Sequence, residues 1–215
     1  GDVYKRQGEM AEHPGLMHAG EFELVGFSVG VVDKHEMITR ESVTPDDVII
    51  GLHSPGLRSN GYSLARKVLF DTAKKSIHDP VWDGTDVTVG EELLRPSVIY
   101  TPTVLKVLEQ NQVKAIAHIT GGGLPGNVNR VLPDDMDAEI LKETWSPPRI
   151  FTEIQSLGNI DEGEMFKVFN MGIGMVLIVD QQSVDSTQEI IDATGLSSTQ
   201  IGTVKANGTG SVEIV

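Results

Sequence analysis

The sequence feature that most constrains the fold is an apolar run, residues 113–119, followed after Thr120 by three consecutive glycines, Gly121 to Gly123. The run is typical of a buried β-strand, and a short helical stretch is expected at 128–132. Glycine has no Cβ, so the backbone between strand and helix can turn sharply and point several N–H groups at one spot. A helix N-terminus adds a partial positive charge there. The pattern therefore indicates either a tight turn or a loop that binds an anion such as phosphate.

Strand-like and helix-like segments intermix along the rest of the chain. Apolar runs and helical spacing predict strands at 22–32, 48–52, 138–141, 173–179, 202–206 and 211–215, and helices at 62–73, 102–110, 149–156, 162–169 and 184–193. In the second of these helices, Val104, Leu105 and Leu108 are expected to share the apolar face. Asn207-Gly208 predicts a turn between the last two strands. The expected fold class is α/β (α+β), a mixed β-sheet with helices packed on it.

Composition and charge exclude several classes of function. The chain has 215 residues, enough for one large or two small domains, and a formal net charge of −14. Such acidity argues against a nucleic-acid-binding surface, which needs clustered Lys and Arg. The sequence contains no cysteine, so it cannot form disulfides or Cys-based zinc sites. No apolar run reaches transmembrane length and no signal peptide is visible, so we expect a cytoplasmic protein without membrane contacts.

Three short patterns outside the glycine-rich segment also bear on function. Glu9 and Glu12 lie three residues apart, where two carboxylates can meet one cation or one proton, or can lie on a solvated loop. Gly26-Phe27-Ser28-Val29-Gly30 matches the G-x-S-x-G pattern of hydrolases, but the β pattern continues through it, so Ser28 is expected to be a strand residue. Gly172-Ile173-Gly174 lacks the third glycine of a dinucleotide-binding fingerprint and is expected to serve packing.

A second polar loop, Ser59-Asn60-Gly61, also lies between an expected strand and an expected helix. Ser or Asn at that position is typical of a helix cap, and it also directs polar groups into a cleft above the strand ends. If the strands at 48–52 and 113–119 are neighbours, this loop and the glycine-rich segment line a single cleft. His118, directly before that segment, fits either a structural polar residue or a site residue.

Longer segments of the chain resemble one enzyme family. They read SPGLRSNGYSLARK (54–67), AIAHITGGGLPGN (115–127) with RVLP (130–133), GNI (158–160), EMF (164–166), FNMGIGM (169–175) and, near the start, GEMAEHPG (8–15). In this order they are similar to the phosphoribosylformylglycinamidine cyclo-ligases, also called AIR synthetases. The resemblance runs from Gly8 to the C-terminus, and it implies the C-terminal domain of the AIR-synthetase-like superfamily.

The resemblance implies an enzyme that carries out ATP-dependent cyclisation of formylglycinamidine ribonucleotide to aminoimidazole ribonucleotide in purine biosynthesis. Phosphorylation of the formyl oxygen makes it a good leaving group, and an amidine nitrogen then closes the ring. Family members are homodimers with a small-molecule nucleotide substrate, and an N-terminal half, missing here, holds most of the ATP and Mg²⁺. We expect residues 1–7 to be a non-native leader, 8–46 a linking segment with one strand, and 47–215 the C-terminal domain, inactive alone.

Roles for individual residues follow from their positions in the matched segments. The resemblance implies catalytic roles for Ser59, Asn60 and His118; substrate or phosphate contacts for Arg58, Gly61, Thr120, Gly121, Gly122, Gly123 and Asn127; and a hinge or cation role for Glu9 and Glu12. No metal ligand is assigned. The chain departs from the family pattern at Gln7, Met10, His13, Arg58 and Asn129. Arg58 replaces a common His, so it suits a contact with an anion and does not suit proton transfer.

Two other functions are compatible with parts of the pattern. One is a related ATP-dependent phosphoryl-transfer enzyme of the same superfamily, such as a selenophosphate synthetase or a thiamine monophosphate kinase. The other is a non-catalytic module that binds phosphate esters. The long match at 54–67 argues against the first alternative.

Overall fold

The computed structural model of the chain describes residues 29–111, 113–206 and 208–215. The chain divides into two compact units, residues 1–37 and 38–215. The described part of the first unit, 29–37, contains one turn and is exposed throughout. All the described helices and strands belong to the second unit.

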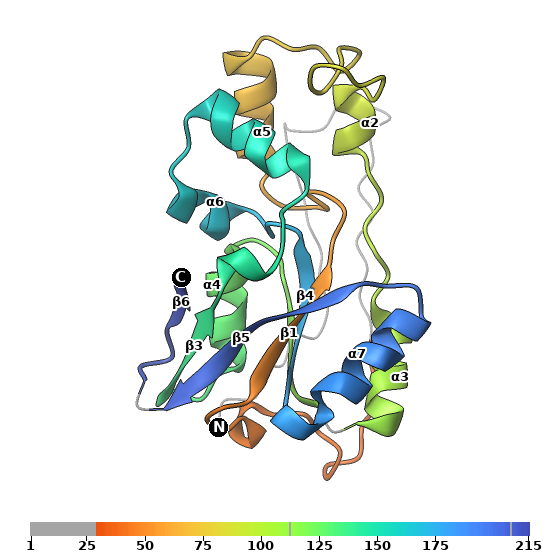
Figure 1. Ribbon diagram of the computed structural model, residues 1–215, viewed down its shortest axis with the longest axis vertical. Coiled ribbons are helices and arrows are strands. Elements are labelled where there is room, and N and C mark those ends of the chain that lie inside the picture. The colour runs from red at the N-terminus through yellow and green to blue at the C-terminus, as the bar shows by residue number, and fades with distance from the viewer. Residues whose placement is uncertain (1–28, 112, 207) are drawn as a thin grey trace. The chain divides into compact units, whose positions relative to one another are not determined.

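The second unit is built on a six-stranded mixed sheet with helices on both faces (Figure 1). The strands are β1 (Val48–His53), β2 (Val113–His118), β3 (Met136–Ile140), β4 (Ile173–Val179), β5 (Ser198–Ala206) and β6 (Val212–Ile214). The helices are α1 (Tyr62–Arg66), α2 (Val89–Leu93), α3 (Thr101–Gln110), α4 (Gly123–Val128), α5 (Arg149–Gly158), α6 (Glu162–Val168) and α7 (Val184–Ala193). A π-helical segment, Lys67–Thr72, extends α1, and 3₁₀ turns lie at Arg40–Ser42, Asn129–Val131, Lys142–Thr144 and Gln181–Ser183.

The order of the strands places the ends of β1 and β2 at the same edge of the sheet. The order is β2-β4-β1-β5-β3-β6, and β4 pairs antiparallel with both β1 and β2. β1 and β2 therefore run in the same direction, but they are not neighbours, because β4 lies between them. Two loops leave this edge: the β1 loop, residues 54–61, and the glycine loop, residues 119–123.

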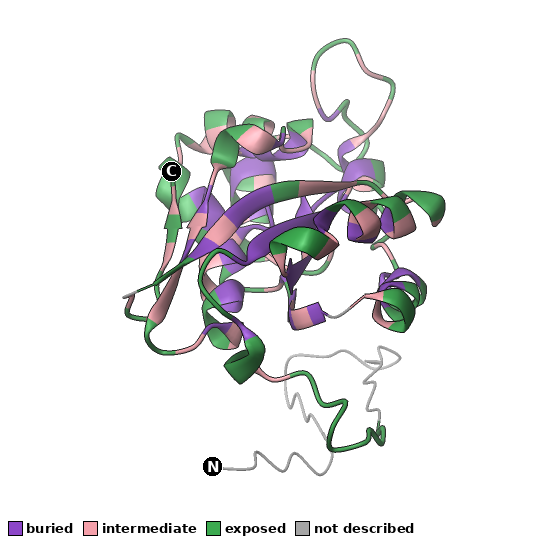
Figure 2. Cartoon of the chain, turned by 60° about the horizontal axis from the view of Figure 1, so that its bottom comes forward, coloured by how far each residue is buried: buried purple, intermediate pink, exposed green. Residues whose placement is uncertain are grey.

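The two faces of the sheet carry separate hydrophobic cores. Along β1 the side chains alternate: Val48 and Ile50 pack with α3 and α7, whereas Ile49 packs with α1, α4, α5 and α6. A strand covered on both faces needs apolar residues at successive positions, which explains the continuous apolar sequences of β1 and β4. Figure 2 shows the central strands buried and the outer sides of the helices exposed.

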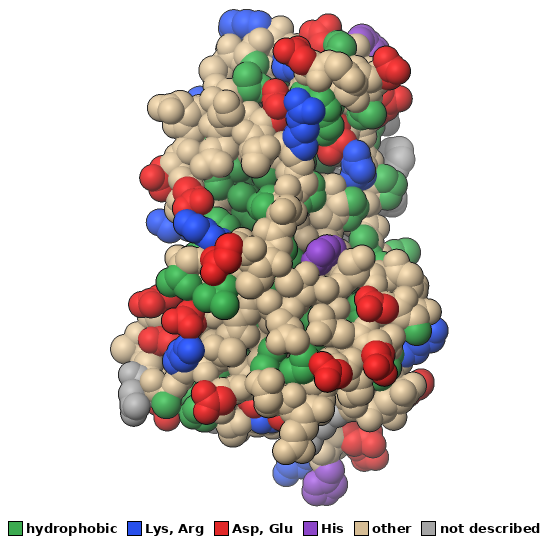
Figure 3. Space-filling view, viewed as in Figure 1, with side chains coloured by type: hydrophobic (Ala, Val, Ile, Leu, Met, Phe, Trp, Pro, Cys, Tyr) green, Lys and Arg blue, Asp and Glu red, His purple; other side chains and the backbone are tan. Residues whose placement is uncertain are grey.

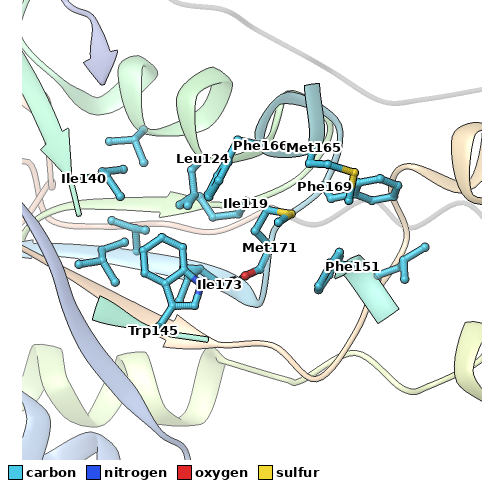
Figure 4. Packing of buried hydrophobic residues seen from close by; sticks show 14 of the residues in the cluster. Ile119, Leu124, Ile140, Trp145, Phe151, Met165, Phe166, Phe169, Met171 and Ile173 are labelled. Carbon is cyan, nitrogen blue, oxygen red and sulfur yellow. Dashed lines mark hydrogen bonds between the residues drawn. The ribbon is translucent and has the colours of Figure 1, made fainter. Parts of the chain in front are cut away.

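The larger core lies next to the two loops (Figure 4). Ile119 and Leu124, at the two sides of the glycine turn, are buried there together with Phe169 and Met171. The indole N–H of Trp145 donates a 2.8 Å hydrogen bond to the Met171 carbonyl, so the buried tryptophan has its polar atom satisfied. Close packing of this kind gives the loops a rigid apolar base.

Most of the predicted elements are present, and the predicted class, a mixed sheet with helices packed on it, is confirmed. The strands predicted at 48–52, 113–119, 138–141, 173–179, 202–206 and 211–215 correspond to β1 to β6 in order. The helices predicted at 62–73, 102–110, 149–156, 162–169 and 184–193 correspond to α1 with its π-helical extension, α3, α5, α6 and α7.

The structure differs from the prediction near both ends of the chain. The strand predicted at 22–32 is not present at 29–32, which is exposed and has no strand partner among the described residues; 22–28 lies outside them. The last two strands do not form a hairpin, because β3 lies between β5 and β6 and pairs with both. The chain crosses the start of β3, where the Asp137 carboxylate accepts 2.7 Å hydrogen bonds from the N–H groups of Thr209 and Ser211. Of the predicted turn at 207–208, Asn207 lies outside the described residues.

Two details of the helices also differ from the prediction. The helix expected at 128–132 begins earlier, at Gly123, and ends in a 3₁₀ turn, because the positive φ of Gly122 closes the preceding turn and lets the helix start at once. On α3, Leu105 is 54% exposed, and Val107 takes its place in the core. The residues three and four positions after Val104 are 107 and 108, so these share its face.

Candidate functional site

The structure brings predicted site residues from two separate segments together. A guanidinium nitrogen of Arg58, Nη2, lies in hydrogen-bond contact with Nε2 of His118, across the beginning of β4. Asn60 also faces the glycine loop, because a Cβ built on Gly121 would lie 3.6 Å from Asn60 Oδ1. The β1 loop and the glycine loop therefore form one surface although their strands are not adjacent.

The glycine loop adopts backbone conformations that only glycine takes up easily. Gly122 and Gly123 have φ angles of +98° and +60°. A Cβ on Gly123 would lie 1.8 Å from the carbonyl oxygen of Phe166. The N–H of Gly123 closes the turn by donating to the Thr120 carbonyl at 3.1 Å. The N–H groups of the exposed Gly121 and Gly122 have no acceptor in the described part of the chain, so these two are open to a ligand.

Asn127, on α4, holds the glycine loop from beneath. Its side chain is buried, and its Nδ2 donates to the Gly123 carbonyl at 2.7 Å and to the carbonyls of Thr120 and Gly121 at 3.3 Å. Its Oδ1 accepts a 3.1 Å hydrogen bond from Thr120 Oγ1. The amide is therefore directed at the loop backbone, and the predicted contact between Asn127 and the substrate stays a prediction.

Asn170, just before β4, holds the β1 loop in a similar way. Its buried Nδ2 donates to the Gly56 carbonyl at 2.9 Å, and its Oδ1 accepts from the N–H of Gly172 at 2.7 Å. The N–H of Ser54 also donates to the Gly172 carbonyl at 2.7 Å. No role was predicted for Asn170, although it lies in one of the segments that resemble the family. An asparagine shortly before two closely spaced glycines, Gly172 and Gly174, was the sequence signal that could have identified it.

Arg58 spans the distance between the two loops. Its Nη1 donates to the carbonyls of Gly174 at 2.7 Å and of Ile119 at 3.2 Å, and its guanidinium lies 5.5 Å from the centre of the Tyr100 ring. A Cβ on Gly174 would lie 2.8 Å from Nη1 and 2.1 Å from Tyr100 Oη, so the packing role predicted for Gly174 is confirmed. Burial lowers the pKa of Arg58, and the pKa of a guanidinium starts so high that the group stays charged at neutral pH.

Tyr100 and His53 form the inner part of this polar cluster. Tyr100 Oη donates to the His53 carbonyl at 2.8 Å, and His53 Nε2 lies 2.8 Å from Thr199 Oγ1. Burial raises the pKa of Tyr100 and lowers the pKa of His53, so both side chains are neutral at pH 7. No sequence signal indicated Tyr100, because it lies at the start of a helix far from either loop in the chain.

His118 lies at the open side of the cluster and is exposed. Partial burial by the surrounding chain and, secondly, the positive charge of Arg58 lower the pKa of His118 below its ordinary value. The imidazole is therefore neutral at pH 7 and can take part in hydrogen bonds either as a donor or as an acceptor.

Ser59 and Asn60 do not cap the helix that follows them, contrary to the expectation from their position. The residue at the helix N-cap is Gly61, which has a φ of +81° and makes no side-chain capping bond. A Cβ on Gly61 would lie 2.4 Å from the Phe169 ring, so glycine is needed there for close packing. The side chains of Ser59 and Asn60 are consequently not used by α1.

A surface groove of about 490 Å³ adjoins the outer side of the glycine loop. Its lining residues are Gly122, Pro125, Gly126, Asn129, Lys167, Gly210, Ser211 and Val212. Lys167 supplies its charged group, so the side of the loop that carries Gly122 faces a concave surface suited to an anion.

Charged groups give no sign of a metal centre or of a basic surface in the described residues. No group of three or more His, Asp or Glu side chains close enough to hold a metal ion occurs among them, and Glu9 and Glu12 lie outside them. On the face shown in Figure 3, Lys and Arg are interspersed with Asp and Glu and do not form one patch. None of the described helices is both long and apolar enough to cross a membrane.

Comparison with known proteins identifies relatives over most of the chain. Residues 44–215 match the family described as AIR synthase related protein, C-terminal domain. The phosphoribosylformylglycinamidine cyclo-ligases of Brevibacillus brevis and Myxococcus xanthus are 48% and 45% identical over 199 residues. These alignments cover 93% of this chain and 57% of each relative, so the chain spans less than two thirds of the relatives' length.

Solved structures share the fold at much lower identity. A hydrogenase maturation protein HypE superposes with a TM-score of 0.57 at 14% identity, over 86% of this chain and 53% of that protein. A thiamine-monophosphate kinase from Stenotrophomonas maltophilia gives a TM-score of 0.56 at 15% identity, over 85% and 54% of the two chains. At this level of identity the comparison shows a common fold.

Proposed function

Because this chain belongs to the family of AIR synthase-related C-terminal domains, we propose that it forms part of a phosphoribosylformylglycinamidine cyclo-ligase. The identity of 48% to a relative of that name, over 93% of this chain, supports the proposal. The cyclo-ligase activity is proposed for a protein as long as these relatives, of which this chain would be one part. The chain by itself is proposed to lack turnover, since it matches 57% of that relative.

The proposed reaction is the ATP-dependent closure of an imidazole ring. ATP supplies a phosphoryl group to the formyl oxygen of formylglycinamidine ribonucleotide, and an amidine nitrogen attacks the activated carbon as phosphate leaves. Phosphoryl transfer of this kind depends on positioning and charge stabilisation, and it needs no covalent nucleophile on the protein. A chain without cysteine, whose site offers hydrogen-bond donors from amide, guanidinium and backbone N–H groups, fits that requirement.

One observation carries the proposal. Within the described part of the chain, the backbone N–H groups of Gly121 and Gly122 have no hydrogen-bond acceptor. Asn127 fixes the conformation that leaves them open. We propose that these two N–H groups bind a phosphate of the substrate or the phosphoryl group in transfer. Ser59 and Asn60, which α1 does not use as caps, are proposed to orient the reacting group from the opposite loop.

The resemblance to the family also suggests which cofactors and partners the protein has. The described residues fit an anion, through the open N–H groups and Lys167, and no group of three or more His, Asp or Glu side chains that could hold a metal ion occurs among them. We propose that Mg²⁺ and most of ATP are held by the segment of the relatives that this chain does not match. We also propose a cytoplasmic homodimer with a small-molecule nucleotide substrate, from the resemblance to the family.

The test is a graft. Residues 44–215 replace the matching segment of the Brevibacillus brevis cyclo-ligase, and turnover of formylglycinamidine ribonucleotide with ATP is measured. We expect turnover by the graft and none by the chain alone. A folded graft that binds ATP without closing the ring would refute the proposed reaction. In an active graft, Gly122→Val should raise the KM for the ribonucleotide strongly, and unchanged kinetics would exclude the glycine loop as the phosphate site.

A phosphoryl-transfer enzyme with another substrate is not favoured. The thiamine-monophosphate kinase shares the fold at 15% identity, whereas relatives named cyclo-ligase reach 48%. A non-catalytic phosphate-binding module is separated from the cyclo-ligase by the same graft, because such a module binds the ribonucleotide and leaves ATP unhydrolysed.

A further inference from the structure

The Arg58 guanidinium is placed to orient His118, and most of its donors are used by the protein itself. Nη1 donates to the carbonyls of Ile119 and Gly174, and Nη2 lies against Nε2 of His118. Nε is buried and has no partner in the described part of the chain. The face of the group lies over Tyr100. Three of the five N–H donors therefore have partners in the chain and the Nε donor is buried, so a single N–H of Nη2 is left for the anion contact expected of Arg58.

The contact between Arg58 and His118 has a definite direction. A guanidinium has donors and no acceptor, and it stays charged at neutral pH. Nε2 of His118 must therefore supply a lone pair, and an imidazole with a lone pair on Nε2 carries its single proton on Nδ1. We propose that Arg58 fixes His118 in the neutral tautomer protonated on Nδ1, so that His118 offers the substrate an N–H donor.

The surroundings of the pair favour the neutral ring. The titratable groups on the elements packed against it are His53 and Tyr100, both neutral at pH 7, and Arg58 itself. Within the described residues, no carboxylate forms an ion pair with Arg58 or His118. A carboxylate there would favour the imidazolium ion, and the positive charge of Arg58 opposes it.

The tautomer decides what His118 can do in the reaction, and this step rests on the proposed function. With Nε2 bound to Arg58 and Nδ1 protonated, neither nitrogen has a free lone pair, so His118 cannot serve as a general base. It can donate a hydrogen bond to an oxygen that gains negative charge, such as the formyl or phosphoryl oxygen. Arg58 then acts through His118, as a positioning residue.

The tautomer can be measured on the chain itself by ¹⁵N NMR of the histidine side chains at pH 7.5. We expect His118 to show a protonated Nδ1 and an unprotonated Nε2. In Arg58→Gln the pattern should shift toward the Nε2-protonated form that free histidine prefers, and the pKa of His118 should rise toward its ordinary value. Arg58→Lys, which keeps the charge, should retain the lowered pKa. A protonated Nε2 in the unaltered chain would overturn the proposal.

A control variant separates this role from a merely structural one. Arg66→Gln removes an exposed arginine of α1 and should leave the His118 signals unchanged. If Arg58→Gln fails to fold, the tautomer in the unaltered chain and the pKa in Arg58→Lys still decide the question.

Kinetics of the active graft test the functional step separately. Arg58→Gln should lower kcat by about 100-fold, the cost typical of losing one oriented donor, and should move the acid limb of the kcat–pH profile to higher pH. Arg58→Lys should keep the acid limb where it is. A folded graft that binds ATP and does not close the ring would refute the proposed function and leave the tautomer result standing. Equal pH profiles for the unaltered graft and Arg58→Gln would refute the role of Arg58 in the reaction.

Discussion

The β1 loop and the glycine loop lie at the same edge of the sheet, but different interactions hold them in place. The β1 loop depends on contacts that are distant in sequence: Asn170 reaches Gly56 across 114 positions, and Arg58 reaches Gly174 across 116. The turn of the glycine loop depends on nearby groups, since Asn127 is seven positions from Thr120, and only Ile119, at its start, has distant partners in Arg58 and Gly174. The first loop presents side chains to the site, and the second presents its backbone.

This difference predicts how each loop responds to substitution. A loop held by distant side chains loosens when the element that supplies them is altered, so the β1 loop is coupled to the start of β4. A loop held by its own backbone conformation tolerates distant changes and is sensitive to any side chain added at its glycines. Substitutions in the two loops can therefore test the distinction directly.

The largest effect is expected from Gly123→Ala. The added Cβ would overlap the Phe166 carbonyl, and the positive φ adds strain, so we expect a loss of unfolding free energy of more than about 3 kcal/mol. Gly126→Ala is the matched control on the same helix, because a Cβ there meets nothing within 4 Å. It should be neutral or stabilising, by up to about 1 kcal/mol. Urea denaturation of both variants measures the difference. Equal stabilities would mean that the close packing at Gly123 is not a constraint.

Removing the two buried amides should give the next largest effects. Asn170→Ala leaves the Gly172 N–H unpaired in a buried region and leaves the Gly56 carbonyl with only its 3.2 Å hydrogen bond from Ser54 Oγ, which should cost about 2–3 kcal/mol. Asn127→Ala should cost about 1–2 kcal/mol, because two of the three carbonyls that lose the amide belong to Thr120 and Gly121, which water can reach, and only Gly123 is buried.

Hydrogen exchange distinguishes the two amide variants beyond their stability. Asn170→Ala should speed exchange in both the β1 loop and the start of β4, whereas Asn127→Ala should speed it in the glycine loop alone. Faster exchange throughout both loops in either variant would show that the loops form one cooperative unit, and the contrast between them would fail.

A smaller effect is expected within the glycine triplet. Gly122→Ala forces a side chain into a φ of +98° and within 3.3 Å of Gly126 Cα, which should cost about 1–2 kcal/mol. Gly121→Ala should cost less than about 0.5 kcal/mol, because its Cβ would make an ordinary contact of 3.6 Å and its φ is not positive. Thermal denaturation of the two variants measures the difference in stability. A larger loss of stability in Gly121→Ala than in Gly122→Ala would contradict the role given to the positive φ of Gly122.

The sequence predicted the elements well where apolar pattern and burial coincide. β1 and β4 are apolar throughout because each is covered on both faces, and this signal is local. The residue sets of the site were predicted from matched segments, and the structure brings Arg58, Asn60, His118 and Gly121 together. The order of the strands could not be predicted in this way. The pairing of β3 between β5 and β6 depends on contacts such as Asp137 with Ser211, which no local pattern encodes.

The parts of the site that the sequence did not reveal are those that depend on tertiary contacts. The position of Ser59 and Asn60 suited a helix cap, and the cap was lost because Gly61 packs against Phe169 and takes the N-cap position itself. Asn170 and Tyr100 lie far along the chain from the loops they support. Their roles follow from the geometry around Gly172 and Gly174, where the absence of a side chain admits them.

The smallest effect is expected from pH. The folded-state pKa of His118 lies below its ordinary value of about 6.5, so the unfolded chain binds more protons as the pH falls through that value. The stability tied to His118 is therefore fully present above about pH 6.5 and is lost as the pH drops toward the lowered pKa. His53 adds a dependence of the same sign. Because the ring that titrates touches the β1 loop through Arg58, this dependence links the two loops.

Unfolding free energies measured from pH 7.5 to pH 5 check this link. His118→Gln should flatten the dependence, and the double variant His53→Gln/His118→Gln should flatten it further. Arg58→Gln should flatten it as well, because removing the positive charge lets the imidazole bind its proton at a higher pH in the folded state. If Arg58→Gln leaves the slope unchanged while His118→Gln removes it, burial alone sets the pKa of His118. The charge of Arg58 in the β1 loop would then have no effect on His118 beside the glycine loop, and the two loops would not be coupled electrostatically.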